Sequence, residues 1–157
     1  MNRPGAAPLV LSARFPRALR LKQRRLLRPL FRKGQSGTVA AGSVRLTFQR
    51  VPRAALPHDV PLQVAFVPGR QPTAVVRNRV RRILREVYRR HHRALVDLLV
   101  LPPAEALTLA VLFRGTSAPD LFARVSADLP RALGHLADAL RPPLEAPPDG
   151  SAPADAA

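Results

Sequence analysis

The pattern of apolar and polar positions predicts short strands alternating with helices. Three apolar runs predict strands: residues 43–51, 61–67 and 107–113. The first run alternates strictly, with Val44, Leu46 and Phe48 on one side and polar residues on the other, which is typical of a half-buried strand. The small residues of 35–42 predict a loop before it.

Helical spacing predicts three helices: residues 24–32, residues 74 to about 101, and residues 121–140. In the central helix, Val80, Ile83, Leu84 and Val87 stand at positions i, i+3, i+4 and i+7 and therefore share one face. Thr73 precedes this helix as a plausible N-cap. The pattern continues beyond residue 93 and is expected to stop before the proline at 102.

Prolines interrupt the two outer helices. Pro29 is tolerated if it lies in the first turn of its helix, and it otherwise produces a kink. Pro130 stands inside the last helix, which is therefore expected to be kinked or divided. Thr116 or Ser117 is the expected cap of that helix.

The order of helix, strands, helix, strand and helix predicts an α+β fold, with helices packed on a small sheet. The predicted domain covers residues 18–140. Residues 1–17 are expected to form a flexible N-terminal extension. Residues 141–157, rich in proline, alanine and aspartate, are expected to form a disordered C-terminal tail.

Charge changes this picture from a plain α+β domain to one that binds a polyanion. The net charge is +16, and arginine is the main basic residue. Residues 1–93 hold 22 basic and 2 acidic residues, whereas residues 94–157 hold 4 basic and 8 acidic ones. A GC-rich coding sequence explains arginine in place of lysine but not the excess of base over acid. The first part of the fold is therefore expected to bind nucleic acid.

The central helix carries most of the candidate contacts. Arginines flank its apolar stripe at i, i+3 and i+4 spacing, so their positive charges repel one another. This repulsion is expected if a bound polyanion neutralises the charges. The candidate RNA-binding residues are Arg70, Arg77, Asn78, Arg79, Arg81, Arg82, Arg85 and Arg89. Asn78 has two possible roles, bracing the start of the helix or reading RNA.

The sequence also argues against other chemistries. The absence of cysteine excludes disulfides and thiolate metal sites and fits a reducing, cytoplasmic location. No apolar run reaches the ~18–20 residues of a membrane span. Residues 18–93 contain only Asp59 and Glu86 as carboxylates, too few for protein-based acid–base catalysis. We therefore expect no catalytic residue, no protein-bound metal and no bound cofactor.

The run from Ala74 to Tyr88 resembles the signature of the protein subunit of bacterial ribonuclease P. Ala74, Val75, Arg77, Asn78 and Arg79 match its Ala-Val-x-Arg-Asn-Arg start. The stretches 20–22 and 30–34 resemble the family's N-terminal helix, and the likeness covers roughly residues 20–140. The stretch 69–73 departs from the family, because Pro-Thr replaces its usual Gly-Asn turn.

This resemblance implies an α-β-β-β-α-β-α sandwich with a left-handed crossover at the basic helix, as in a small-subunit ribosomal protein domain. It implies that the chain binds the ribonuclease P RNA and precursor tRNA, and helps the RNA, with its bound Mg²⁺, to remove the 5′ leader. It also implies a leader cleft, for which Phe31, Arg45 and Thr47 are the candidates. On spacing alone, Phe31 fits a core position better.

Two other functions remain open from the residues alone. A non-catalytic ribosomal protein or RNA chaperone would share the charge and the fold. A peripheral membrane protein would use the basic helix on lipid, but the apolar face of this helix lacks Trp and Phe and is needed for the core.

Overall fold

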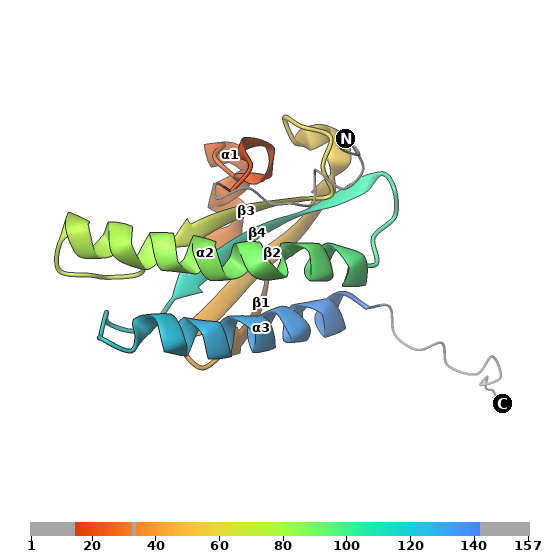
Figure 1. The fold of residues 1–157 in the computed structure, drawn as a ribbon. Coiled ribbons are helices and arrows are strands. Elements are labelled where there is room, and N and C mark those ends of the chain that lie inside the picture. The colour runs from red at the N-terminus through yellow and green to blue at the C-terminus, as the bar shows by residue number, and fades with distance from the viewer. Residues whose placement is uncertain (1–14, 33, 142–157) are drawn as a thin grey trace, which may run out of the picture.

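The computed structural model describes residues 15–32 and 34–141. Its main elements are the helices α1 (Arg24–Leu27), α2 (Ala74–Leu98) and α3 (Leu121–Leu140) and the strands β1 (Gly37–Ala41), β2 (Val44–Pro52), β3 (Leu62–Val67) and β4 (Glu105–Phe113). Short 3-10 helices supplement them: η2 (Arg17–Leu19), η3 (Arg28–Phe31) and η4 (Arg53–Ala55). The order of helices and strands, α-β-β-β-α-β-α, confirms the predicted α+β fold (Figure 1).

The strands form one mixed sheet in the order β1-β2-β4-β3. β2 pairs antiparallel with both β1 and β4, whereas β3 and β4 are parallel. Parallel neighbours need a long connection, and α2 provides it. The prediction of a loop over residues 35–42 was wrong, because Gly37–Ala41 pairs with β2 as strand β1.

The sheet separates two apolar clusters. α2 and α3 run side by side and cover one face, where Leu107, Leu109 and Val111 of β4 join the main core (Figure 1). The alternate residues Ala106 and Ala110 point to the other face and pack under α1, η3 and η4. The period of two along β4 therefore divides the molecule into a large helical layer and a thinner N-terminal layer.

The folded domain begins before the predicted boundary at residue 18. Phe15 is 2% exposed, and its ring meets the rings of Phe66 and Tyr88 edge to face at 5.5 and 5.7 Å. Residues 15–17 are therefore part of the domain. The rest of the predicted N-terminal extension and residues 142–157 of the predicted tail lie outside the described residues.

Caps and prolines set the ends of the helices. The Thr73 side chain accepts a hydrogen bond from the Val76 amide at 3.1 Å, which confirms the predicted N-cap of α2. Pro29 falls where α1 gives way to η3, so the first predicted helix is divided there. α3 is continuous through Pro130. Its predicted cap was wrong: α3 starts after Asp120, and Ser117 has other partners, described below.

Candidate nucleic-acid interface

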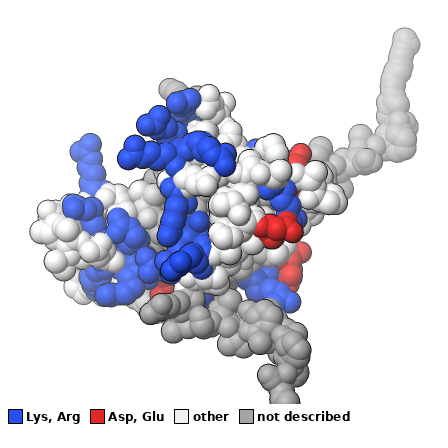
Figure 2. All heavy atoms as spheres, turned by 90° about the horizontal axis from the view of Figure 1, so that it is seen from above, with Lys and Arg blue, Asp and Glu red and all other residues white. Residues whose placement is uncertain are grey.

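The outward face of α2 carries exposed basic side chains above a buried apolar stripe. Val80, Leu84 and Val87 are buried in the main core. The helix is long because Thr73 caps its start and the crossover from β3 to β4 must span the sheet. The predicted RNA-binding residues Arg77, Asn78, Arg79 and Arg82 are exposed on its first three turns. In Figure 2, Lys and Arg side chains form a broad band across the side of the molecule that carries α1.

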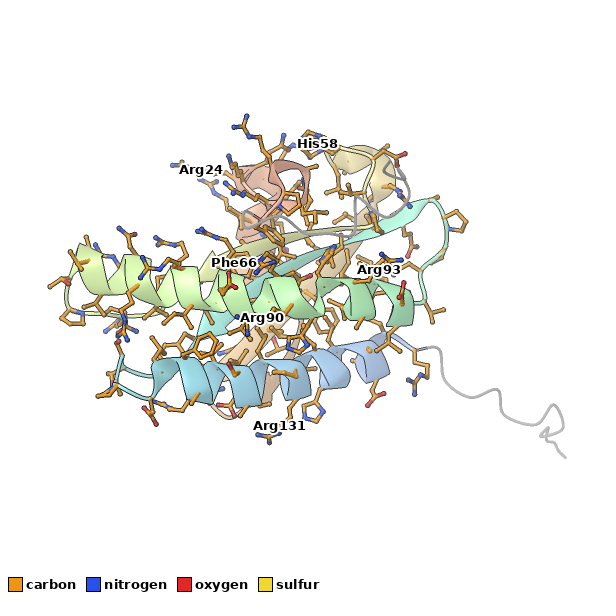
Figure 3. The ribbon with its side chains drawn as sticks, in the orientation of Figure 1. Arg24, His58, Phe66, Arg90, Arg93 and Arg131 are labelled. Carbon is orange, nitrogen blue, oxygen red and sulfur yellow. The ribbon has the colours of Figure 1, made fainter. Side chains whose placement is uncertain are left out.

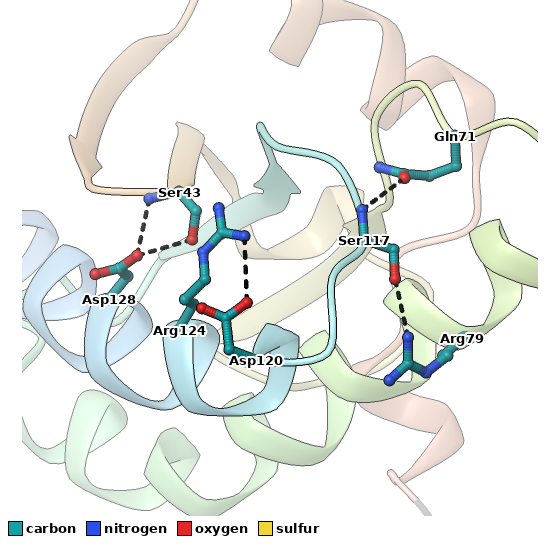
Figure 4. A network of polar contacts seen from close by, with 7 residues as sticks. All are labelled: Ser43, Gln71, Arg79, Ser117, Asp120, Arg124 and Asp128. Atoms are coloured by element: carbon teal, nitrogen blue, oxygen red, sulfur yellow. Dashed lines mark hydrogen bonds and ion pairs between the residues drawn. The ribbon is translucent and has the colours of Figure 1, made fainter.

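Two polar contacts order the start of this face. The Arg81 guanidinium donates to Asn78 Oδ1 at 2.8 Å, so Asn78 positions a neighbouring arginine, and its contact with RNA stays a prediction. The Arg79 guanidinium donates to Ser117 Oγ at 2.9 Å (Figure 4). Both contacts hold a charged side chain in one direction and leave its remaining donors available to a phosphate.

Arg89 differs from the other arginines of the helix. Its side chain is 19% exposed and donates to Glu86 Oε2 at 2.8 Å. The hydrogen bond from Arg89 lowers the pKa of Glu86, which therefore remains ionised and offsets the charge of its partner. Among the predicted RNA-binding residues, Arg89 is thus more enclosed than Arg77 or Arg82.

The turn that leads into α2 is fixed by a buried amide. Gly69 has a φ of +74°, and a Cβ there would collide with the Phe113 carbonyl oxygen, so only glycine fits. Gln71 Nε2 donates to the carbonyl oxygens of Pro68 at 2.8 Å and Gly115 at 2.9 Å. Its Oε1 accepts the Ser117 amide at 3.2 Å (Figure 4). Sequence reasoning did not single out Gln71, because its partners on the loop after β4 are distant in the chain.

A basic cavity of about 490 Å³ lies between α2 and the N-terminal layer. Its charged lining consists of Arg20, Lys22, Arg81 and Arg85, and Phe31 closes one side. The pKa of Arg85 is lowered, mainly by burial and then by repulsion from Arg20, Arg81 and Arg82. An anion placed here would relieve that repulsion.

Arg20 and Lys22 were not predicted as site residues, although they belong to the stretch 20–22 that carries the family resemblance. Arg20 is held by hydrogen bonds from Nε and Nη2 to the Phe15 carbonyl oxygen, at 3.2 and 2.9 Å. Their place in the cavity depends on the isolated pairing of Arg20 with Val64 of β3, a contact that no local pattern indicates.

A second cavity, of about 410 Å³, lies between η3 and the strands β1 and β2. Phe31 is 50% exposed and lines both cavities, so it does not occupy the core position that its spacing suggested. Arg45 and Thr47 share the lining with Ser36 and Thr38, as expected for two residues on the same strand face. Thr47 is 4% exposed, and its Oγ1 has no hydrogen-bond partner among the described residues.

The structure therefore arranges the predicted site residues in three groups. Phe31, Arg45 and Thr47 meet in the second cavity, and Arg81 and Arg85 line the first. The third group is exposed: Arg77, Arg79 and Arg82 on α2 and Arg70 on the preceding turn, whereas Arg89 is more enclosed. We call the two cavities together the basic cleft. Its basic walls, aromatic ring and hydroxyl groups suit the backbone and bases of a single strand.

A group of metal ligands and a membrane-spanning helix are both absent from the described residues. Among residues 15–32 and 34–141, no three His, Cys, Asp or Glu side chains gather closely enough to hold a metal ion. None of the described helices is long and apolar enough to span a bilayer.

Comparisons with known proteins agree with this geometry. A family model described as Ribonuclease P matches residues 15–136. The solved RNase P protein of Staphylococcus aureus has a similar fold, with a TM-score of 0.50 and 14% identity, over 79% of this chain and 99% of that one. No curated protein sequence gives a significant match. Because the family match spans most of the chain, the chain belongs to the ribonuclease P protein subunit family, whose members form part of an endoribonuclease that acts in tRNA processing.

Proposed function

We propose that this chain is the protein component of a ribonuclease P that binds both the catalytic RNA and the 5′ leader of precursor tRNA. The observation that carries the proposal is the basic cleft, placed directly beside the arginine face of α2. The arginine face of α2 would bind the catalytic RNA, and the cleft would hold the leader of the precursor tRNA. The protein would therefore contact the catalyst and its substrate at the same time.

The α2 face would bind the catalytic RNA mainly through phosphates. Arginine forks onto phosphate oxygens, and neutralised phosphates release counterions, so the affinity is expected to fall with salt. Such contacts position the RNA rather than read its sequence. The exposed Arg77 and Arg82 and the ordered Arg79 and Arg81 are the residues best placed for this role.

The leader would lie in the basic cleft. A base stacked on the exposed Phe31 ring would gain about 1–3 kcal/mol, as is usual for single strands on aromatic platforms. Arg20, Lys22, Arg81 and Arg85 would neutralise the leader's phosphates on one side of that ring and Arg45 on the other. Thr47, whose side chain is buried beneath this lining, would shape the floor of the cleft.

Hydrolysis would belong to the RNA and its Mg²⁺. Mg²⁺ prefers oxygen ligands and binds phosphates readily, so RNA is a natural host for it. The protein would act by binding: the leader held in the cleft adds affinity for precursor tRNA, and positive charge reduces the repulsion between two RNAs. Its benefit is therefore expected to be largest at low Mg²⁺.

The experiment is reconstitution with the cognate RNA and precursor tRNA at low Mg²⁺. We expect the wild-type protein to increase 5′ cleavage over RNA alone, and Phe31→Ala to lose part of that increase through weaker precursor binding. Phe122→Ala is the matched control, because Phe122 is an exposed ring on α3 that does not line the basic cleft.

No gain in 5′ cleavage by the wild-type protein would sink the proposal. Sequencing the RNA that co-purifies with the protein provides a second, independent test. Ribosomal RNA or a mixture of unrelated RNAs would favour a ribosomal protein or an RNA chaperone instead.

A further inference from the structure

Three exposed arginines lie along α1, η3 and the residue that follows η3, and two of them are outside the surfaces described so far. Arg24, Arg28 and Arg32 follow one another at intervals of four residues, and all three are exposed. In residues 15–32 and 34–141, no carboxylate forms an ion pair with any of them. The Arg28 amide donates to the Arg24 carbonyl oxygen, so these two arginines lie one helical turn apart and their like charges repel, whereas Arg32 follows η3 in an extended conformation. We call these three residues the outer arginine row.

Only one residue of the row lines the basic cleft. Arg32 lines the second cavity, next to Phe31, whereas Arg24 and Arg28 line neither cavity. Figure 3 shows Arg24 extending from α1 away from the sheet and from α2. Arg32 therefore connects the row to the cleft, and Arg24 and Arg28 lie outside the cleft on the wall that α1 and η3 form.

The direction of a strand in the cleft follows from the proposed function. If the catalytic RNA lies on α2, the cleaved bond lies on that side, and leader nucleotides near it enter the cleft past Arg81 and Arg85. Nucleotides further from the bond then leave past Phe31 and Arg45, where Arg32 is the next cation.

We propose that the outer arginine row binds the distal part of the leader, the nucleotides that extend beyond the basic cleft. This inference rests on the proposed function and extends it. The row contacts phosphates, because the exposed guanidinium groups of Arg24 and Arg28 line neither cavity of the basic cleft and so offer charge and not shape. The protein then binds precursors with long leaders more tightly than precursors whose leaders fill only the cleft.

The test combines a leader-length series with two variants of equal net charge in the reconstituted complex. Arg24→Gln/Arg28→Gln removes the two row residues outside the cleft. Arg131→Gln/Arg141→Gln removes two exposed arginines of the α3 layer, and Arg131 projects from the opposite side of the molecule to Arg24 (Figure 3). Precursor affinity is measured against salt for each leader length.

For long leaders, the row variant is expected to bind several-fold more weakly than the wild-type protein. Its plot of log affinity against log salt is expected to be shallower by about 1.4, because each lost single-strand phosphate contact contributes about 0.7. Short-leader precursors, the catalytic RNA and the α3 control are expected to show no change.

Three results overturn the proposal while the proposed function stands: an unchanged affinity of the row variant at every leader length, an equal loss at every length, or weaker binding of the catalytic RNA. An equal loss or a loss of catalytic-RNA binding would assign the row to that RNA. If the wild-type protein itself adds no affinity for any precursor, the proposed function fails and the row proposal fails with it.

Discussion

Gln71 connects the turn before α2 to the loop that follows β4. Its buried side chain bonds two carbonyl oxygens and one amide, which belong to the turn before α2 and the loop after β4. Ser117, one of these partners, also accepts from Arg79. Gln71 thus positions Arg79, a charged residue of the candidate interface, through Ser117.

Replacing Gln71 with alanine is expected to reduce the free energy of unfolding by about 1–3 kcal/mol, because buried backbone groups lose their partners. Gln71→Glu is expected to cost more, because a carboxylate cannot donate to the carbonyls of Pro68 and Gly115. Urea unfolding measures both values. Gln49→Ala is the control, since it removes one exposed hydrogen bond. Equal stability of Gln71→Ala and Gln49→Ala would show that the network contributes little.

Residues with local partners could be predicted from the sequence, and residues with distant partners could not. Thr73 caps α2 through an amide three positions away, so a short pattern indicated it. Gln71 bonds Gly115 and Ser117 across 44 and 46 positions. Phe15 was assigned to a flexible extension for the same reason, because only the folded chain brings it against Phe66 and Tyr88.

At the scale of the elements, the spacing of apolar residues along the sequence predicted the helices and strands that have a strong apolar face. β2, β3, β4, α2 and α3 each bury large side chains at a regular interval, so their existence followed from the pattern. β1 has only a weak apolar face, formed by Val39 and Ala41. Its Gly37 lies opposite Phe48, whose ring occupies the place of a Cβ, so the small residue that suggested a loop is what allows the strand to pair.

α3 is attached to the turn between β1 and β2 by a carboxylate. Asp128 Oδ2 accepts the Ser43 amide at 2.9 Å and the Ser43 hydroxyl at 2.8 Å (Figure 4). The Ser43 amide is the main reason that the pKa of Asp128 is lowered, and the nearby Arg131 adds to the effect. The ionised form is therefore favoured in the folded protein.

This lowered pKa predicts a dependence of stability on pH. The stabilisation is fully present above the ordinary aspartate pKa of about 3.9 and is lost as the pH falls through the lower folded value. Asp128→Asn is expected to be less stable than the wild-type protein at pH 7, and the difference should shrink below about pH 4. Unfolding by urea from pH 3 to pH 7 measures it.

Asp138→Asn is the matched control for this experiment. Asp138 lies on the same helix, and its exposed side chain pairs with Arg141 on the surface at 3.3 Å. Exposed ion pairs contribute about 0–1 kcal/mol, so this variant is expected to stay close to wild type at every pH. A pH-independent difference between Asp128→Asn and wild type would contradict the assigned role of the charge.

At the scale of the whole molecule, the basic residues that are concentrated in the first part of the chain are also grouped together in the folded structure. The basic first part supplies α1, η3 and α2, which carry the band of Lys and Arg in Figure 2. The sequence predicted that this part binds a polyanion. The family resemblance implied a leader cleft with Phe31, Arg45 and Thr47. It did not point to Arg20 and Lys22, because the cavity that they line needs α2, the N-terminal layer and one sheet face to assemble around it.

The position of the arginines on α2, and not only their number, is expected to determine RNA binding. Two triple variants reduce the net charge equally, to +13, from the +16 of the chain. One changes three arginines of α2 to glutamine, Arg77, Arg81 and Arg82. The other changes three arginines of the α3 layer to glutamine, Arg124, Arg131 and Arg141. The α2 variant also removes like-charge neighbours at i,i+4 spacing, so it is expected to fold at least as well as the wild-type protein.

We expect the α2 variant to lose affinity for the ribonuclease P RNA, with a salt slope shallower by about 2–3 for three lost phosphate contacts. The α3 variant should keep both affinity and slope, because its arginines lie outside the proposed interface, and each has an acidic neighbour within 4 Å. Filter binding at several salt concentrations, with circular dichroism to confirm folding, measures these values. Equal losses in the two variants would mean that the RNA responds to net charge alone, and the assignment of the interface to α2 would be wrong.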